Sequence, residues 1–188
     1  NILIGSALLQ KGRDLNSALL LSPEGEWRSA YHKQRLVPFA EFTPALAEAL
    51  ARGLKIGKYH FTAGTQPGAM VLAGGARFGT AICSEEFYPL LLRRTAAGGA
   101  EFTVVMLNDG WFVRREALFL HALAAPLRAV ETGVPVIRAA NTGRTMAVDA
   151  FGRMIGRPLD VGQLGMAVYD IPSGARRTFY ARWGDVFA

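Results

Sequence analysis

Short apolar strands alternate with helical stretches through the second half of the chain, and this alternation constrains the fold most. Apolar, β-type runs at residues 77–82, 102–107 and 134–139 are separated by helical patterns at residues 89–97 and 116–132. Chains with this alternation fold as layered domains in which helices cover a sheet. The predicted fold class is therefore α/β.

Hairpins are predicted around this unit. Residues 27–31 return after 17–21 across a Pro-Glu-Gly-Glu turn, and residues 70–73 pair with 77–82 across Gly74-Gly75, because paired glycines supply positive-φ turn positions. The other predicted features are a buried strand at 1–9, two helical turns at 45–52, strands at 145–149 and 165–171, a kink or break at Pro126, and a polar, aromatic arm at 172–188.

Composition bounds the domain count and excludes several function classes. With 188 residues, of which 51% are hydrophobic, the chain can fill one core, so residues 1–188 are predicted to form a single domain. One cysteine and three widely spaced histidines provide no disulfide framework and no metal-binding motif, and neither metal nor cofactor is expected. The net charge of +6 comes from scattered arginines without a recognition motif, so no nucleic-acid partner is expected.

Cys83 is the candidate nucleophile. It stands where the apolar run 77–82 ends, ahead of Ser84-Glu85-Glu86 and a helix. A cysteine at such a strand-to-helix turn is exposed at the end of a sheet, and nearby backbone N–H groups favour a thiolate and stabilise an oxyanion. A buried structural cysteine is the alternative. Two adjacent glutamates argue against it, because carboxylates rarely lie in a core.

Lys33 and Glu41 are the other candidates for chemistry. Lys33 follows the predicted strand 27–31, and Glu41 lies in a loop framed by Pro38 and Pro44. A lysine beside a cysteine lowers the pKa of the thiol and holds a developing oxyanion, and a carboxylate positions that lysine. Taken singly, each residue is better explained as a surface charge, and only their combination with Cys83 points to chemistry.

Five ordered motifs resemble one known superfamily. They are Tyr-His-Lys-Gln-Arg-Leu-Val-Pro-Phe-Ala-Glu-Phe at 31–42, Ile-Cys-Ser-Glu at 82–85, Asn-Asp-Gly-Trp-Phe at 108–112, the segment 128–143, and Tyr-Ala-Arg-Trp-Gly-Asp at 180–185. Together they resemble the nitrilase superfamily of carbon–nitrogen hydrolases. The Leu-Val-Pro-Phe-Ala-Glu-Phe loop and the last motif are most similar to the catalytic domain of bacterial apolipoprotein N-acyltransferases.

The resemblance implies a four-layer α-β-β-α sandwich, incomplete at its N-terminus, that acts without a cofactor. Cys83 would take an acyl chain from a phospholipid as a thioester and pass it to the N-terminal amine of a diacylglyceryl-cysteine apolipoprotein. Lys33 matches the lysine of the Glu-Lys-Cys triad, and Glu41 and Glu85 match two supporting glutamates. Asn108, Trp111 and Phe112 are the substrate-binding candidates. The implied location is the bacterial inner membrane, with the catalytic domain facing the periplasm.

The sequence departs from the family pattern in several places. The triad's general-base glutamate is expected upstream of residue 1, as are the family's membrane helices, so these 188 residues alone are expected to be a weak catalyst. Ser84 stands where an aromatic residue is usual, and Val113, Leu120 and Pro126 also depart from the pattern.

Two other function classes stay open on the sequence. A soluble carbon–nitrogen hydrolase could use the same triad on a small amide or nitrile and release ammonia. A truncated, inactive domain could serve as a binding module. The Leu-Val-Pro-Phe-Ala-Glu loop and the ending at 180–185 favour the acyltransferase.

Overall fold

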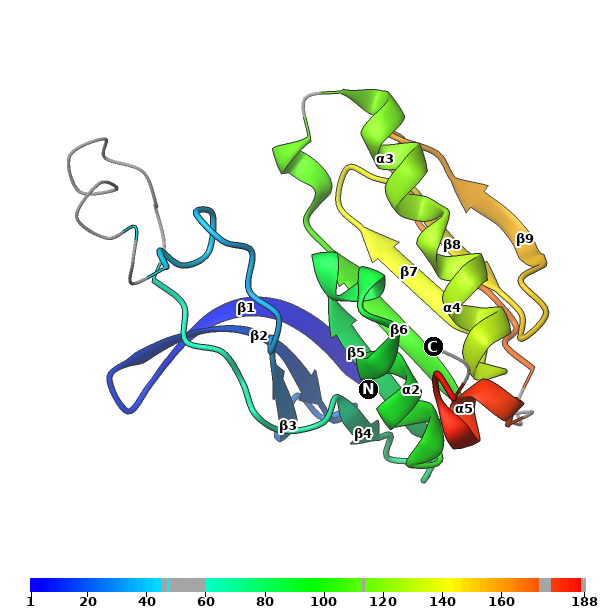
Figure 1. Cartoon of the computed structure of the whole chain (residues 1–188), viewed down its shortest axis with the longest axis horizontal. Coiled ribbons are helices and arrows are strands. Elements are labelled where there is room, and N and C mark those ends of the chain that lie inside the picture. The colour runs from blue at the N-terminus through cyan, green and yellow to red at the C-terminus, as the bar shows by residue number, and fades with distance from the viewer. Residues whose placement is uncertain (45–46, 48–59, 113, 173–176, 187–188) are drawn as a thin grey trace.

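Two β-sheets and a layer of helices make up the structure, a computed structural model that describes residues 1–44, 47, 60–112, 114–172 and 177–186 (Figure 1). The helical turns predicted at 45–52 lie outside the described residues except for Ala47. The predicted α/β class is confirmed.

The smaller sheet is an antiparallel array of three strands in the order β1-β2-β3. Its strands are β1 (Ile2–Gln10), β2 (Arg13–Leu21) and β3 (Trp27–His32). The predicted pairing of 17–21 with 27–31 is confirmed, and β2 begins earlier than expected. A tight turn at Lys11-Gly12, both at positive φ, joins β1 to β2.

The prediction that residues 1–9 form a buried strand was correct in strand type and wrong in burial. Ile2, Ile4 and Leu9 are 54%, 42% and 72% exposed. In the described residues β1 pairs only with β2 and forms the edge of its sheet. One long side of this apolar strand therefore has no neighbouring strand in the part of the chain described.

The larger sheet has six strands in the order β4 to β9. They are β4 (Ala69–Val71), β5 (Arg77–Ile82), β6 (Phe102–Leu107), β7 (Val136–Ala140), β8 (Thr145–Val148) and β9 (Met154–Leu159). The predicted hairpin across Gly74-Gly75 is present, with Gly75 at a φ of 89°. Strands β5, β6 and β7 run parallel, so their carboxyl ends meet at one edge of the sheet.

Two strand assignments near the C-terminus need correction. The last strand of the sheet is β9, which the sequence analysis did not identify, and it pairs antiparallel with β8. The strand predicted at 165–171 is absent, although its residues alternate as a strand would. Leu164, Met166 and Val168 are 96%, 89% and 88% exposed, because no strand pairs with this segment in the described residues.

The long helix predicted at 116–132 is two helices. These are α3 (Arg115–Ala122) and α4 (Ala124–Thr132), and the break at Leu123 confirms the expected interruption. Pro126 lies in the first turn of α4, where its missing N–H removes no intrahelical bond. Gly133 ends α4 at a φ of 71°, the left-handed conformation that glycine adopts readily.

The layers place the core on both sides of the larger sheet. Its helix-covered face packs against α2 (Pro89–Ala97) and α4. The short α5 (Phe179–Trp183), which forms part of the predicted C-terminal arm, packs on these two helices (Figure 1). Between the two sheets a second core contains Leu20, Tyr31, Phe78 and Ile82. The described residues thus form an α-β-β arrangement in which the carboxyl end of β5 faces the segment after β3.

Candidate active site

Cys83 lies at the carboxyl end of β5, at the first position of the 3-10 helix η2 (Cys83–Phe87). Its φ is 53°, a left-handed conformation that is uncommon outside glycine. Such strained positions between a strand and a helix present a nucleophile at the end of a sheet. The structure therefore places the only cysteine of the chain at the strand-to-helix turn that the sequence predicts.

Three charged side chains and the surrounding protein act on the thiol of Cys83. Burial has the largest effect and raises the pKa of the thiol. The Lys33 ammonium lowers that pKa, whereas the Asp109 and Glu41 carboxylates raise it. The backbone N–H of Ser84 also lowers the pKa, as expected for the turn, but the net direction is upward because desolvation outweighs the favourable groups. The Lys33 ammonium is the largest of the influences that favour the thiolate.

Lys33 directly follows β3 and forms a buried ion pair with Glu41. Its ammonium lies 2.9 and 2.8 Å from the two carboxylate oxygens, and the side chains are 1% and 14% exposed. Glu41 also accepts hydrogen bonds from the Asn16 amide and the Val37 backbone N–H, at 2.8 and 2.7 Å. These contacts fix the lysine in one position, as expected for a carboxylate that positions a cation.

Glu85 is fully buried and connects the segment after β3 to the Cys83 turn. Its carboxylate accepts hydrogen bonds from the backbone N–H groups of Gln34, Arg35 and Ile82 at 2.7, 3.0 and 2.9 Å. The Tyr31 hydroxyl donates to the same carboxylate, at 2.8 Å from Oε1. Every donor comes from a residue close in sequence to Lys33 or Cys83. Glu85 therefore fixes the position of the segment that carries Lys33 relative to the turn that carries Cys83, although it is hydrogen-bonded to neither of these two side chains.

The burial of Glu85 and Glu86 corrects one argument made from the sequence. Both are 0% exposed, whereas we expected adjacent glutamates to lie at the surface. Each carboxylate is accommodated by its own donors: Glu85 by the groups above, and Glu86 by the guanidinium of Arg138 at 3.0 Å. Paired or hydrogen-bonded carboxylates can be buried, and sequence alone does not reveal such partners. Cys83 itself is only partly buried, so its candidacy stands on its position and neighbours.

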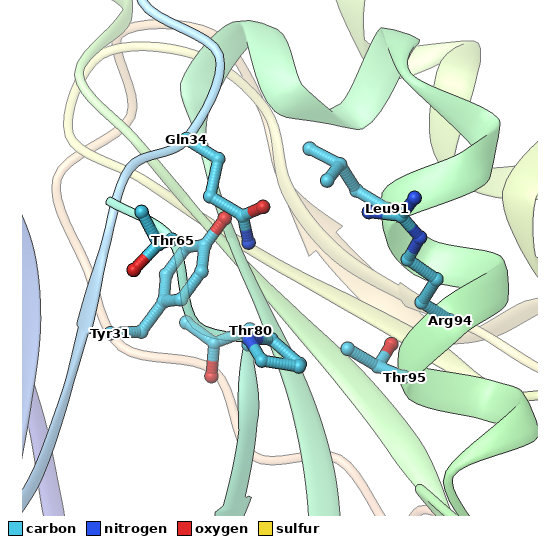
Figure 2. A pocket seen from close by; sticks show the side chains of 9 residues that line it. Tyr31, Gln34, Thr65, Thr80, Leu91, Arg94 and Thr95 are labelled. Atoms are coloured by element: carbon cyan, nitrogen blue, oxygen red, sulfur yellow. The ribbon is translucent and has the colours of Figure 1, made fainter. Parts of the chain in front are cut away.

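A cavity of about 40 Å³ is lined in part by Tyr31, whose hydroxyl donates to Glu85, and Figure 2 shows the side chains that line it. Tyr31, Thr65 and Thr80 lie on one side, Leu91, Arg94 and Thr95 of α2 lie on the other, and the amide of Gln34 points between them. A space of this size holds one or two water molecules and no acyl chain. Cys83 does not line it, so the cavity is part of the support behind the site.

A cluster of four charged or titratable side chains lies behind the turn, and the sequence analysis did not identify it. Glu86, Asp109, His121 and Arg138 are each at most 2% exposed. His121 Nδ1 lies 3.0 Å from Asp109, and Arg138 Nη2 lies 3.8 Å from the same carboxylate. Burial raises the pKa of Glu86 to about 7, against the lowering effects of Arg138 and His121.

The segment 108–112 was predicted to contact substrate, and the structure shows how it is held beside the turn. The Asn141 side chain accepts from the Asp109 backbone N–H at 3.0 Å and donates to Asn108 at 2.7 Å. Gly143 packs so closely on Asp109 that a Cβ there would lie 1.9 Å from a carboxylate oxygen. Trp111 and Phe112 are 62% and 41% exposed, and one edge contact joins the Phe112 ring to the buried His121.

The described residues contain no group of three or more His, Cys, Asp and Glu side chains arranged to bind a metal ion. A wider groove of about 440 Å³ lies along α3, α4 and β9. None of the seven candidate site residues lines that groove. The chemistry that the site offers is therefore that of a thiol, an ammonium and carboxylates.

Three features together define a class of protein. They are a cysteine directly after a strand, a buried lysine–glutamate pair and an α-β-β arrangement of layers. The family model for carbon–nitrogen hydrolases matches residues 1–180, and the chain belongs to that family. The solved structure of Nit3 from Saccharomyces cerevisiae, a member of branch 10 of the nitrilase superfamily, has the same fold. It matches with a TM-score of 0.64 and 17% identity, over 86% of this chain and 55% of that chain.

Relatives with one shared name cover nearly the whole chain. It is 37% identical over 191 residues to an apolipoprotein N-acyltransferase of Geobacter metallireducens, which covers 98% of this chain and 36% of the relative. It is 31% identical over 195 residues to apolipoprotein N-acyltransferase 2 of Treponema denticola, covering 98% of this chain and 37% of the relative. The chain thus spans about a third of the length of these relatives.

Replacing Glu85 by glutamine tests its structural role. The amide nitrogen of the new side chain would face at least one backbone N–H, leaving two donors opposed in a buried site. We expect Glu85→Gln to lower the free energy of unfolding by about 2–4 kcal/mol, measured by chemical denaturation. The matched control is Glu26→Gln, at an exposed position, with a change below about 0.5 kcal/mol. Equal stability of the two variants would contradict this role.

Replacing Lys33 by methionine tests the electrostatic support of Cys83. Removing the ammonium leaves burial and two carboxylates to raise the pKa of the thiol. We expect Lys33→Met to slow alkylation of Cys83 by iodoacetamide at pH 7.5 about tenfold, which is one pKa unit. Peptide mass spectrometry measures the rate, and the exposed Lys11→Met is the control. An unchanged rate in Lys33→Met would show that the lysine does not act on the thiol.

Proposed function

We propose that this chain is the catalytic domain of an N-acyltransferase that transfers an acyl chain from a phospholipid to the N-terminal amine of a diacylglyceryl-cysteine apolipoprotein. The observation that carries the proposal is the similarity, over 98% of the chain, to relatives named apolipoprotein N-acyltransferase. The arrangement of Cys83, Lys33 and Glu41 supports it, because acyl transfer needs a nucleophile and a cation and requires no metal.

In the first step Cys83 attacks the ester carbonyl of the phospholipid. The thiol proton passes to a general base, which the family resemblance places upstream of residue 1. The new carbon–sulfur bond gives a tetrahedral intermediate whose oxyanion faces the Lys33 ammonium. The carbon–oxygen bond of the ester then breaks. The lysophospholipid leaves with the proton, and Cys83 holds the acyl chain as a thioester.

In the second step the free amine of the acceptor attacks the thioester. The carbon–nitrogen bond forms, the carbon–sulfur bond breaks, and Cys83 leaves as a thiolate that recovers a proton lost by the amine. Glu41 keeps Lys33 beside both intermediates, and Glu85 keeps the Cys83 turn in register with Lys33. Both glutamates are thus assigned positioning roles, and Asn108, Trp111 and Phe112 are assigned to the substrate side of the turn.

The site of action that fits this reaction is the bacterial inner membrane, with the domain on the periplasmic side. The helices described here include none that is both long and apolar enough to cross a bilayer. We assign membrane attachment to the parts of the relatives that lie beyond the aligned third. The net charge of +6 agrees with work at an anionic lipid surface.

A hydrolase that releases ammonia from a small amide is the second candidate, favoured by the match to the carbon–nitrogen hydrolase family model. The same thioester would then be attacked by water instead of an amine. An inactive binding domain is the third. The three candidates differ in product, so one assay separates them.

The assay supplies the intact gene product with phosphatidylethanolamine vesicles and an S-diacylglyceryl-cysteinyl peptide, and with acetamide in a parallel reaction. We expect mass spectrometry to show the N-acylated peptide and lysophospholipid in equal amounts, no ammonia, and complete loss of product in Cys83→Ala. Ammonia without N-acylated peptide would establish the hydrolase. If the folded gene product forms neither N-acylated peptide nor ammonia, the chain is a binding domain and the proposal is overturned.

A further inference from the structure

Four exposed aromatic side chains belong to the Cys83 turn and to the segment 109–112, and His121 connects these two segments. Phe87 and Tyr88 follow Cys83 at the end of η2, and they are 53% and 42% exposed. Trp111 and Phe112 come from η3 (Asp109–Trp111) and the residue after it. We call these four residues the aromatic rim. Exposed rings gathered beside a candidate nucleophile mark a surface that binds an apolar group.

The buried ring of His121 fixes two members of the rim. Phe87 stacks on it at a centroid distance of 4.8 Å and an interplanar angle of 20°. Phe112 meets the same imidazole edge to face, at 5.6 Å and 62°. His121 is itself held by Asp109 at 3.0 Å and is 2% exposed. Phe87 and Phe112, which belong to different segments, therefore share one rigid support.

A cation stands next to the rim. The Arg35 guanidinium lies 5.6 Å from the centroid of the Tyr88 ring, within the range of a cation–π contact. The backbone N–H of Arg35 donates to Glu85, so the same carboxylate that orders the Cys83 turn also places this arginine. Arg35 is exposed, and among the described residues no carboxylate forms an ion pair with it.

We propose that the aromatic rim and Arg35 form the subsite for the acyl donor, in which Phe87 and Phe112 contact the acyl chain and Arg35 contacts the phosphate. This inference rests on the proposed function and assigns residues to its donor. Phe87 is the fourth residue after Cys83 in η2, about 8 Å along the helix at about 2 Å per residue, which is a distance that an acyl chain held at Cys83 can span. Arginine is suited to phosphate because its planar donors pair with two oxygens.

Charge and apolar surface together distinguish this donor from other occupants. An aqueous amide has no apolar chain to cover the rings, and a free phosphate has none either. A phospholipid presents an ester between an alkyl chain and a phosphodiester, and the segments that adjoin Cys83 offer both phenyl rings and a guanidinium. His121 acts through Phe87 and Phe112, so it is a positioning residue for the chain.

The test uses alkylation of Cys83 in the intact gene product, which needs no acyl transfer. N-ethyl and N-octyl iodoacetamide carry the same reactive carbon and differ only in chain length. We expect the N-octyl reagent to react about tenfold faster, and Phe87→Ala to reduce this ratio to about twofold or less. Phe87→Leu, which keeps an apolar side chain without the stacked ring, is expected to give an intermediate ratio. The control is Trp27→Ala, an exposed aromatic position in β3.

The phosphate contact is tested in the same way. Iodoacetyl-phosphoethanolamine carries a phosphate on the same reactive group, and iodoacetamide is its neutral reference. Arg35→Gln is expected to slow the phosphate reagent about three- to tenfold relative to the neutral one, and the exposed Arg13→Gln to leave the ratio unchanged.

The outcomes separate this inference from the proposed function. The subsite is overturned if Phe87→Ala keeps the wild-type ratio of N-octyl to N-ethyl alkylation rates and Arg35→Gln keeps the wild-type ratio of phosphate-reagent to iodoacetamide rates. This conclusion holds whether or not acyl transfer is found. Ratios that collapse in these variants, in a protein that forms no N-acylated peptide, support the subsite and reject the proposed acceptor reaction.

Discussion

The carboxylate of Glu85 is the interaction on which the candidate site depends. It joins the segment after β3 to the turn after β5, two parts of the chain about 50 residues apart. The two sheets bring these segments near one another, because the inner core packs Tyr31 of β3 against Phe78 and Ile82 of β5. Packing alone sets the distance between the two segments only loosely. Four donors that converge on one buried carboxylate fix the relative position of the segments, and thereby the relative position of Lys33 and Cys83.

Burial has opposite consequences for the two reactive groups. It strengthens the Lys33–Glu41 ion pair by excluding water, and the pair keeps a cation inside the protein. It also opposes ionisation of Cys83 by raising the pKa of the thiol, so deprotonation is assisted by a base. A thiol buried in this way is a weaker nucleophile on its own, and it becomes a stronger one when substrate, lysine and base are assembled.

Local patterns in the sequence predicted the features that depend on residues near one another in the chain. The glycine pair at 74–75 predicted its hairpin, the alternation predicted β5 to β7, and the short motifs led to Cys83, Lys33, Glu41 and Glu85. Features that depend on distant partners were missed. The segment 165–171 alternates like a strand but pairs with no strand in the described residues, and β9 was overlooked because glycine and proline interrupt its apolar pattern. Glu86 is buried because Arg138, 52 residues away, neutralises it.

The central claim is that Cys83 carries the acyl chain, and trapping the thioester tests it most directly. The intact gene product is mixed with phosphatidylethanolamine vesicles of one acyl composition, without acceptor, and the peptide that contains Cys83 is analysed by mass spectrometry. The account predicts a mass increase equal to that acyl group, located on Cys83, removed by neutral hydroxylamine and formed in parallel with lysophospholipid. Lysophospholipid release with an unmodified Cys83, or an acyl group on another residue, would contradict the account.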